Sequence, residues 1–190
     1  GSYGWRGNAQ NGFFNDVFSN ATIHSDWGIV QGNWSVDTTT NELRQKDTTS
    51  GNTNIYAPLI QGMATYLYSW DMRISGAGNN RRAGIHIFAS DTSATRGDSY
   101  LILFNIDNDD VKIYLTDTGG ITLKKTFSNV AMAANATYSC KAVYNSNTGL
   151  LELYMDTLIG TWQPTNPLAS GDYLSFRTGD SKAWFDNIRV

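Results

Sequence analysis

Two glutamates, two histidines and one cysteine are the side chains of this 190-residue sequence that could most readily support catalysis. Glycoside hydrolysis needs two carboxyl groups beside the scissile bond, about 5–5.5 Å apart in retaining enzymes. Glu42 and Glu152 are the only glutamates, and neither begins an E-x-D-x-x-E run that would place such carboxyls on one strand. Cys140 alternates with apolar neighbours, which favours a small buried side chain over a nucleophile. The sequence therefore predicts no catalytic set.

Side chains suited to sugar recognition are better represented. Aromatic rings can cover the apolar C–H faces of sugars, and planar polar groups can hydrogen-bond to pairs of hydroxyls. By alternation, most of the candidates should lie on the sheet face opposite the core, although an ordinary solvated face also mixes such residues. Trp162 and Trp5 stand in loop-like sequence, where a ring is free to serve as a platform. The predicted ligand-binding residues are Asp71, Arg73, Arg82, His86, Phe88, Tyr114, Glu152 and Trp162.

We expect β-strands to position these residues. The segment from Tyr66 to Ile74 places aromatic and apolar side chains at every second position. The segment from Tyr100 to Ile106 is apolar on both faces, as in a central strand covered on both sides. Turn residues such as those from Asp107 to Asp110 separate the strands at intervals of roughly 8–12 residues. Only Val130 to Ala136 suggests a turn or two of helix. The pattern predicts an all-β fold, a two-sheet antiparallel β-sandwich.

Composition narrows the class further. Charged residues make up 16% of the chain and aromatic residues 13%, which favours a packed fold over disorder. The formal net charge of −3 gives no broad basic face for nucleic acid, and no apolar run approaches membrane-spanning length. A single cysteine excludes an intrachain disulfide. We expect residues 1–12 to be a tail or linker remnant and residues 13–190 to form one sandwich domain.

Several short motifs occur in the order typical of one large group of sandwiches. The opening pattern D-x-F … W … G-x-W-x-V is matched by residues 16–19 and 27–36. Residues 81–85 and 98–100 are similar to its R-x-A-G and G-x-Y strands, and residues 185–190 resemble its closing F-D-N-I-x-V. The ordered set spans nearly the whole chain. It resembles the concanavalin A-like lectin and glucanase jelly rolls, a group that includes laminin-G-like modules.

The resemblance implies a structural Ca²⁺ ion where the first and last strands meet, and the matching positions are Asp16 and Asp186. Since Ca²⁺ prefers about six to eight oxygen ligands, carbonyls or waters would have to complete the site. Hydrogen bonds from these carboxylates to strand-end backbone are the alternative. Alginate-type lyases of similar fold use an arginine, a histidine and a tyrosine, and Arg44 and His86 occur in that order here. The strand that would supply the proton-transferring tyrosine is missing, so a lyase is the third choice.

We therefore expect a non-catalytic, lectin-like carbohydrate-binding module that binds a polysaccharide or glycan on its polar sheet face. The same fold hosts enzymes, lectins and adhesion modules, so an adhesion or structural spacer domain is the main alternative. We also expect a secreted, extracellular or cell-surface location and covalently linked neighbouring domains in the parent chain. No nucleic-acid or membrane partner is expected.

Overall fold

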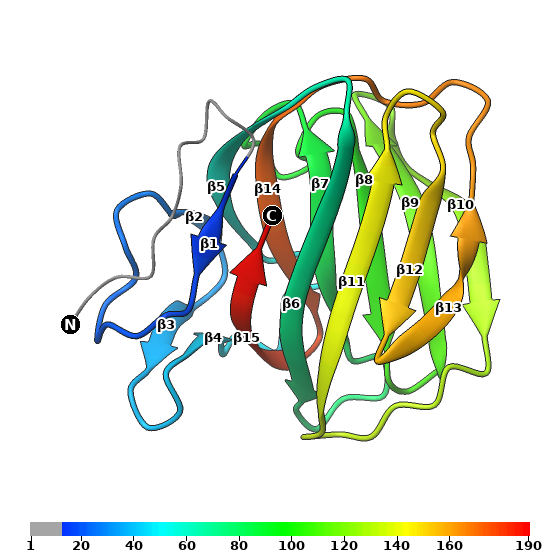
Figure 1. The fold of residues 1–190 in the computed structure, drawn as a ribbon. Coiled ribbons are helices and arrows are strands. Elements are labelled where there is room, and N and C mark those ends of the chain that lie inside the picture. Colours follow the sequence, from blue (N-terminus) through cyan, green and yellow to red (C-terminus); the bar gives the residue numbers. More distant parts are fainter. Residues whose placement is uncertain (1–12) are drawn as a thin grey trace.

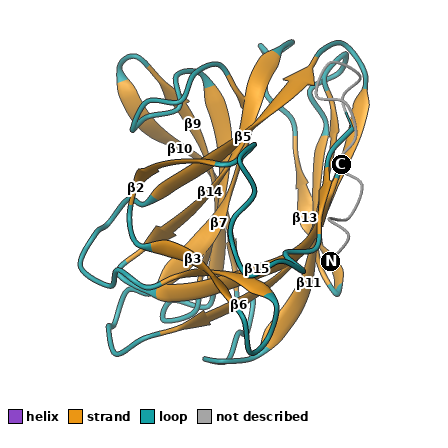
Figure 2. Ribbon diagram, turned by 90° about the vertical axis from the view of Figure 1, so that its left-hand side faces the viewer, coloured by secondary structure: helices purple, strands orange, loops and turns teal. Residues whose placement is uncertain are grey.

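Two antiparallel β-sheets packed face to face make up residues 13–190, the part of the chain that the computed structural model describes (Figure 1, Figure 2). The prediction of an all-β, two-sheet sandwich is confirmed. Residues 1–12, predicted to be a tail, and Trp5 within them lie outside the described residues. The strands are β1 (Asn15–Asp16), β2 (Gly28–Gln31), β3 (Trp34–Asp37), β4 (Glu42–Gln45), β5 (Asn54–Gln61), β6 (Thr65–Ser75), β7 (Arg82–Ala89), β8 (Ser99–Asn105), β9 (Asp110–Asp117), β10 (Gly120–Ser128), β11 (Thr137–Asn145), β12 (Leu151–Met155), β13 (Thr157–Trp162), β14 (Gly171–Gly179) and β15 (Lys182–Arg189).

The two sheets draw their strands from different parts of the sequence. Sheet A has the order β13-β12-β11-β6-β15-β4-β3, and β1 joins it by pairing with β15. Sheet B has the order β10-β9-β8-β7-β14-β5-β2. In Figure 1, sheet A lies in front of sheet B, and β13 and β10 stand at the same edge of the sandwich. Side chains on the outer face of sheet A therefore point away from those on the outer face of sheet B.

Alternating strands build the core between the sheets. In β6, Tyr68 and Trp70 are buried, whereas Ser69 and Asp71 are half-buried and Leu67 is exposed. The ring of Phe176 on β14 stacks on Trp27 and on Phe185 of β15, with ring centroids 5.7 and 4.2 Å away. These aromatic contacts join the two sheets and make the sandwich a rigid platform for whatever its outer faces bind.

The middle of sheet B is buried on both faces, as predicted for Tyr100 to Ile106. All residues of β8 are buried. Part of the outer cover comes from residues 90–98, which connect β7 to β8 and which we call the cover loop. Asn54 Nδ2 on β5 donates to the carbonyl oxygens of Thr92 and Ser93, and Arg96 Nε donates to Ser175 Oγ on β14. The cover loop is thus held against β5 and β14.

The short helix predicted for residues 130–136 is absent. Val130 N–H donates to the carbonyl oxygen of Asp109 at 2.8 Å, and Asn135 N–H donates to that of Ile74 at 2.8 Å. Asn135 also has a φ of +64°, which a helix does not allow. The backbone of this segment is satisfied by other elements. No described residue lies in a helix, so none contributes to a helix long and apolar enough to cross a membrane.

Candidate functional site

The outer face of sheet B carries three of the predicted ligand-binding residues on neighbouring strands. The register places Arg82 of β7 beside Asn105 of β8, which in turn lies beside Asp110 of β9. His86 and Tyr114 occupy a second row of the same face, on either side of β8. A hollow of about 270 Å³, which we call the sheet B groove, is lined by Asn80, Arg82, Leu103, Asn105, Asn108, Asp110, Lys112 and Tyr114.

Hydrogen bonds hold one wall of the sheet B groove in place. Arg82 Nη1 donates to Asp180 Oδ2 at 2.6 Å and to the Asn80 carbonyl oxygen at 2.7 Å. Asn105 Nδ2 donates to Asn80 Oδ1 at 2.8 Å. The guanidinium and the two side-chain amides are therefore fixed before any ligand arrives, which lowers the entropy lost on binding.

The other wall carries a paired charge and a ring. Lys112 Nζ lies 3.0 Å from Asp110 Oδ2. The second carboxylate oxygen, Asp110 Oδ1, is buried and has no hydrogen-bond partner among the described residues. Tyr114, further along β9, adds a half-buried phenol ring to the same lining. The groove thus combines a fixed cation, amides, a carboxylate and an aromatic surface.

Gly84 allows β7 and β8 to approach each other closely in the middle of this face. In the register it stands between Arg177 of β14 and Leu103 of β8. A Cβ atom at this position would lie 1.8 Å from the carbonyl oxygen of Ile102, so the strands can approach this closely only at glycine. As a result, no side chain on β7 separates Arg177 from the Leu103 side of the groove.

Two arginines that sequence reasoning missed lie beside the groove. Arg177, on β14, is half-buried; its Nη2 makes one long hydrogen bond of 3.4 Å to the Gly51 carbonyl oxygen, and its Nε is buried without a partner in the described part of the chain. Arg96, in the cover loop, is fully buried. Its guanidinium donates to neutral acceptors, namely Ser175 Oγ, Asn52 Oδ1, the Ala94 carbonyl oxygen and the Thr53 carbonyl oxygen.

The two guanidinium groups repel each other in a desolvated setting. Desolvation lowers the pKa of Arg96 well below its ordinary value, and the charge of Arg177 lowers it further. For Arg177, desolvation and then repulsion by Arg82 lower the pKa to about 10, with a smaller opposing effect from Tyr114. A guanidinium stays protonated in proteins, so both charges persist at neutral pH. No ion pair joins either group to a carboxylate of residues 13–190.

His86 lies on the predicted face, but it is fully buried. Its Nδ1 is 2.8 Å from Ser99 Oγ, and its Nε2 has no partner among the described residues. Desolvation lowers the pKa of His86 well below its ordinary value, and the charges of Arg96 and Arg177 lower it further. The ring is therefore neutral at neutral pH. Full burial also leaves it no exposed atom, so the predicted direct contact between His86 and a ligand is wrong for this conformation.

Three other predicted residues lie on the opposite side of the molecule. Asp71 and Arg73 of β6 and Glu152 of β12 belong to sheet A, so they share no face with Arg82 or Tyr114. Alternation correctly indicates that these side chains point outward, but it does not say which sheet a strand joins. The prediction of one shared binding face is therefore wrong.

Arg73 and Asp71 both interact with other side chains of sheet A. Arg73 Nη2 donates to Glu42 Oε1 at 2.7 Å, and its guanidinium carbon lies 3.9 Å from the ring centroid of Trp184. Asp71 Oδ2 accepts a hydrogen bond of 2.7 Å from Asn187 Nδ2. These interactions tie β4, β6 and β15 together, which is a structural role.

Phe88 is a core residue, and the prediction that its ring faces a ligand is wrong. Ile87 and Phe88 of β7 oppose Leu174 of β14 at a shift in register, and Phe88 has a φ of +55°. A bulge of this kind interrupts the alternation and turns the next side chain to the other face. The Phe88 ring is fully buried and meets the rings of Tyr144 and Tyr66 edge-on, at centroid distances of 4.8 and 5.4 Å.

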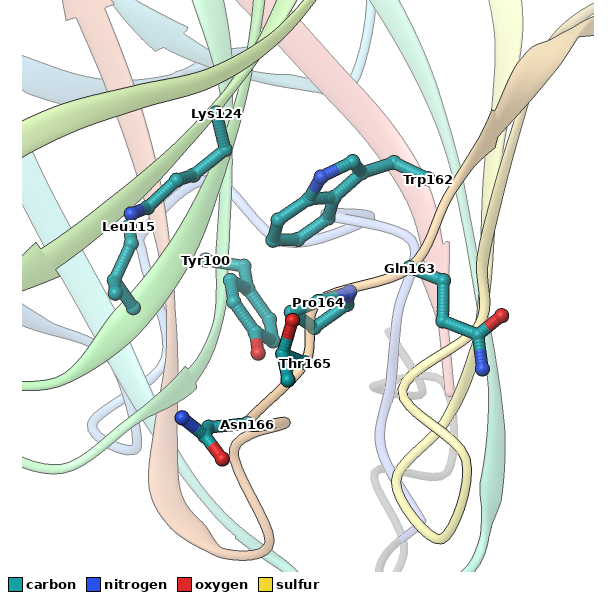
Figure 3. A pocket seen from close by; sticks show the side chains of 8 residues that line it. All are labelled: Tyr100, Leu115, Lys124, Trp162, Gln163, Pro164, Thr165 and Asn166. Atoms are coloured by element: carbon teal, nitrogen blue, oxygen red, sulfur yellow. The ribbon is translucent and has the colours of Figure 1, made fainter.

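Trp162 lines a second hollow, at the end of the sandwich where β9 and β10 approach the segment after β13 (Figure 3). Its ring meets buried Tyr100 edge-on at a centroid distance of 5.4 Å. This hollow has a volume of about 360 Å³ and shares no lining residue with the sheet B groove. The structure thus separates Trp162 from the other predicted residues. The lining consists of Tyr100, Leu115, Lys124, Trp162, Gln163, Pro164, Thr165 and Asn166.

Asp16 and Asp186 lie on the paired strands β1 and β15, at the seam where calcium was predicted. Both oxygens of Asp16 already accept hydrogen bonds, from the Phe18 N–H and from Trp27 Nε1, each at 2.9 Å. Burial raises the pKa of Asp186 to about 6, and its Oδ1 has no partner among the described residues. Residues 13–190 contain no group of three or more His, Cys, Asp or Glu side chains arranged to hold a metal. These two carboxylates do not form a Ca²⁺ ligand set by themselves, and calcium stays a prediction.

The residues with catalytic potential are not brought together. Asp110 is the one carboxylate among the residues that line the groove, and it is paired with Lys112. Arg44, which precedes His86 in the order of the lyase motifs, lies on the outer face of sheet A and forms an ion pair of 2.9 Å with Asp37. His86 lies on the outer face of sheet B. The order of these residues along the chain therefore does not produce one reaction site.

The sequence matches no family model and no curated protein, whereas many solved structures share its fold. The carbohydrate-binding module CBM66 from Bacillus subtilis superposes with a TM-score of 0.71 at 18% identity, over 86% of this chain and 93% of its own. The β-glucanase of Bacillus licheniformis superposes with a TM-score of 0.65 at 15% identity, over 94% of this chain and 97% of its own. The carbohydrate recognition domain of Emp47p superposes with a TM-score of 0.66 at 13% identity, over 94% of each chain. At such identities the similarity shows the fold alone, and the predicted jelly-roll β-sandwich is confirmed.

Proposed function

We propose that the chain is a carbohydrate-binding domain that holds a glycan in the sheet B groove. One observation carries the proposal: the groove combines the ring of Tyr114, the fixed guanidinium of Arg82 and the amide of Asn105 on a rigid sheet. An aromatic ring covers the apolar face of a sugar, and planar polar groups hydrogen-bond to pairs of its hydroxyls. CBM66 is a carbohydrate-binding module and the Emp47p domain is a carbohydrate recognition domain, which supports this choice for a shared fold.

The proposal includes a non-catalytic role in a secreted or cell-surface chain with linked neighbouring domains. The single carboxylate of the groove lining supports the non-catalytic role, because glycoside hydrolysis on this kind of surface needs a pair. A structural spacer that binds no glycan is the main alternative, and a polysaccharide lyase is the other.

Affinity gel electrophoresis with a panel of soluble polysaccharides tests the proposal. The wild-type protein should be retarded by at least one of them. Tyr114→Ala should weaken this interaction at least about tenfold, which corresponds to the loss of roughly 1.4 kcal/mol from one well-packed ring. Tyr154→Ala removes a half-buried tyrosine from β12 of sheet A and is the matched control, which should bind like the wild type.

The other outcomes each point to a different role. If Trp162→Ala abolishes retardation and Tyr114→Ala does not, the glycan lies in the second hollow, which Trp162 lines, and the assignment to the sheet B groove is wrong. If no polysaccharide retards the protein, the spacer is favoured. Release of unsaturated sugars from a polysaccharide indicates a lyase. Repeating the gels with EDTA tests the predicted calcium, because a structural or bridging Ca²⁺ ion would make retardation sensitive to chelation.

A further inference from the structure

The charges around the sheet B groove do not balance. Arg82 is neutralised by Asp180, and Lys112 is neutralised by Asp110. Arg177 lies close enough to Arg82 and to Tyr114, two residues that line the groove, for each of them to shift its pKa. None of the ion pairs of residues 13–190 involves Arg177 or the neighbouring Arg96. Two positive charges therefore stand without counterions in a chain whose formal net charge is −3.

Arg177 is also short of hydrogen bonds. It has five N–H donors, yet its contacts in the described structure amount to one long bond from Nη2, and its Nε is buried without a partner. A guanidinium that is desolvated and unpaired costs free energy, so the folded protein would gain from an anion at this position. An oxyanion with two oxygens in one plane matches the fork of a guanidinium better than any neutral hydroxyl.

We infer that the glycan bound in the sheet B groove carries an oxyanion, a carboxylate or a sulfate ester, and that Arg177 receives it. The inference rests on the proposed function and specifies its ligand class. Gly84 places no side chain between Arg177 of β14 and Leu103, which lines the groove. Arg177 is half-buried and, like the groove residue Arg82, donates to the Gly51 carbonyl oxygen, whereas Arg96 is fully buried. The donors of Arg96 bind the protein itself, so Arg96 adds positive charge without touching the ligand.

Paired polysaccharides that differ only in charge test this inference. Polygalacturonate is compared with its methyl ester, and dextran sulfate with dextran, in affinity gels at one salt concentration. The protein should bind at least one acidic member and bind its neutral partner at least tenfold more weakly. The first pair reports on a carboxylate and the second on a sulfate. Arg177→Gln should weaken binding of the acidic member by about 10- to 100-fold, the usual effect of losing charge-assisted hydrogen bonds.

Two further variants keep the experiment interpretable. Arg177→Lys retains the charge but not the fork, and it should keep part of the affinity while showing that the site tolerates substitution. Arg44→Gln removes the same charge from the outer face of sheet A and should leave binding unchanged. Near-ultraviolet circular dichroism confirms that each variant is folded.

Each remaining outcome is decisive. Equal binding of acidic and neutral partners overturns the anion inference and leaves the proposed carbohydrate binding intact. Equal weakening by Arg177→Gln and Arg44→Gln also overturns it, because the attraction is then diffuse. Binding to none of the four polysaccharides, nor to any in the wider panel, overturns both the inference and the proposed function.

Discussion

Lowering the pH from 7.5 to 5.0 should destabilise this protein through His86. The side chain is fully buried, and the pKa of the folded state is well below the ordinary value, first through desolvation and then through repulsion by Arg96 and Arg177. In the unfolded chain the imidazole titrates near its ordinary pKa of about 6.5. Below that pH the unfolded chain binds a proton that the folded protein does not bind. The stability contribution is therefore complete above about pH 6.5 and decreases as the pH falls.

The expected size follows from the linkage relation. With an unfolded pKa of about 6.5 and an imidazole that stays neutral in the folded protein, the His86 contribution to the free energy of unfolding decreases by about 2 kcal/mol between pH 7.5 and 5.0, which is the most that the linkage relation allows. For a urea m-value of about 2 kcal/mol/M, this contribution corresponds to a difference of about 1 M between the midpoint shifts of the wild type and of a variant without His86. Such a shift is large compared with the error of an equilibrium urea titration.

Urea unfolding of the wild type, His86→Gln and His24→Gln at three pH values checks this prediction. The pKa of Asp186 is raised to about 6 in the folded protein, so the folded state binds a proton more readily than the unfolded chain does. Protonation of Asp186 therefore increases the free energy of unfolding as the pH falls, opposite to the effect of His86. Since Asp186 is present in all three proteins, its contribution cancels in the differences. His86→Gln should lack the loss of about 2 kcal/mol, whereas the control His24→Gln, at a partly exposed site, should retain it. If His86→Gln shows the same pH dependence as the wild type, the reasoning about the buried imidazole is wrong.

Three further substitutions test the geometry around the groove. Gly84→Ala should destabilise the protein by about 2–4 kcal/mol in urea unfolding, because the new Cβ would lie 1.8 Å from the Ile102 carbonyl oxygen. The control Gly62→Ala, where a Cβ would have no neighbour within 4 Å, should change stability by less than about 0.5 kcal/mol. Similar values for both variants would contradict the close strand approach. Asp107→Asn should cost about 1–2 kcal/mol at pH 7, because Arg81 hydrogen-bonds to this carboxylate and lowers its pKa. That contribution is present above the unfolded pKa of 3.8 and is lost as the pH falls through the folded pKa, so calorimetry should show a difference that becomes smaller as the pH is lowered below 3.8. Arg96→Met should speed amide hydrogen exchange in residues 90–98, since three hydrogen bonds to other segments and one within the cover loop are lost. Unchanged exchange would mean that Arg96 does not hold the cover loop.

Alternation was sufficient to predict the sandwich because burial acts on every second residue of a strand. The segment from Tyr66 to Ile74 lies in β6 and the segment from Tyr100 to Ile106 lies in β8 except for its last residue, with the predicted faces. Alternation says nothing about strand order, however, since pairing depends on contacts between distant segments. Arg73 and Tyr114 therefore seemed to share a face although β6 and β9 belong to different sheets.

Local backbone conformation explains the remaining errors at the site. A bulge with positive φ turns Phe88 into the core, and no residue type in the segment from Gly84 to Phe88 announces that bulge. Arg96 and Arg177 are far apart in the sequence, and each looks like an ordinary solvated charge. They become neighbours only because the cover loop folds across β14 and its arginine donates to Ser175. Pairing of this kind is a tertiary property and has no local signal.

The positive charge of the groove is likewise a property of the fold, and this has a consequence for salt dependence. A chain with a net charge of −3 does not attract a polyanion at long range, whereas Arg177 acts on an oxyanion in direct contact, where screening over a Debye length of about 8–10 Å matters little. Binding through one such contact displaces about one counterion. Affinity for an acidic polysaccharide should then fall about fourfold between 50 and 200 mM salt. Proteins that neutralise many phosphates of DNA lose about 10³–10⁵-fold in affinity over the same range. A much steeper dependence would mean that many surface charges act together, and Arg177 alone would no longer explain the selectivity.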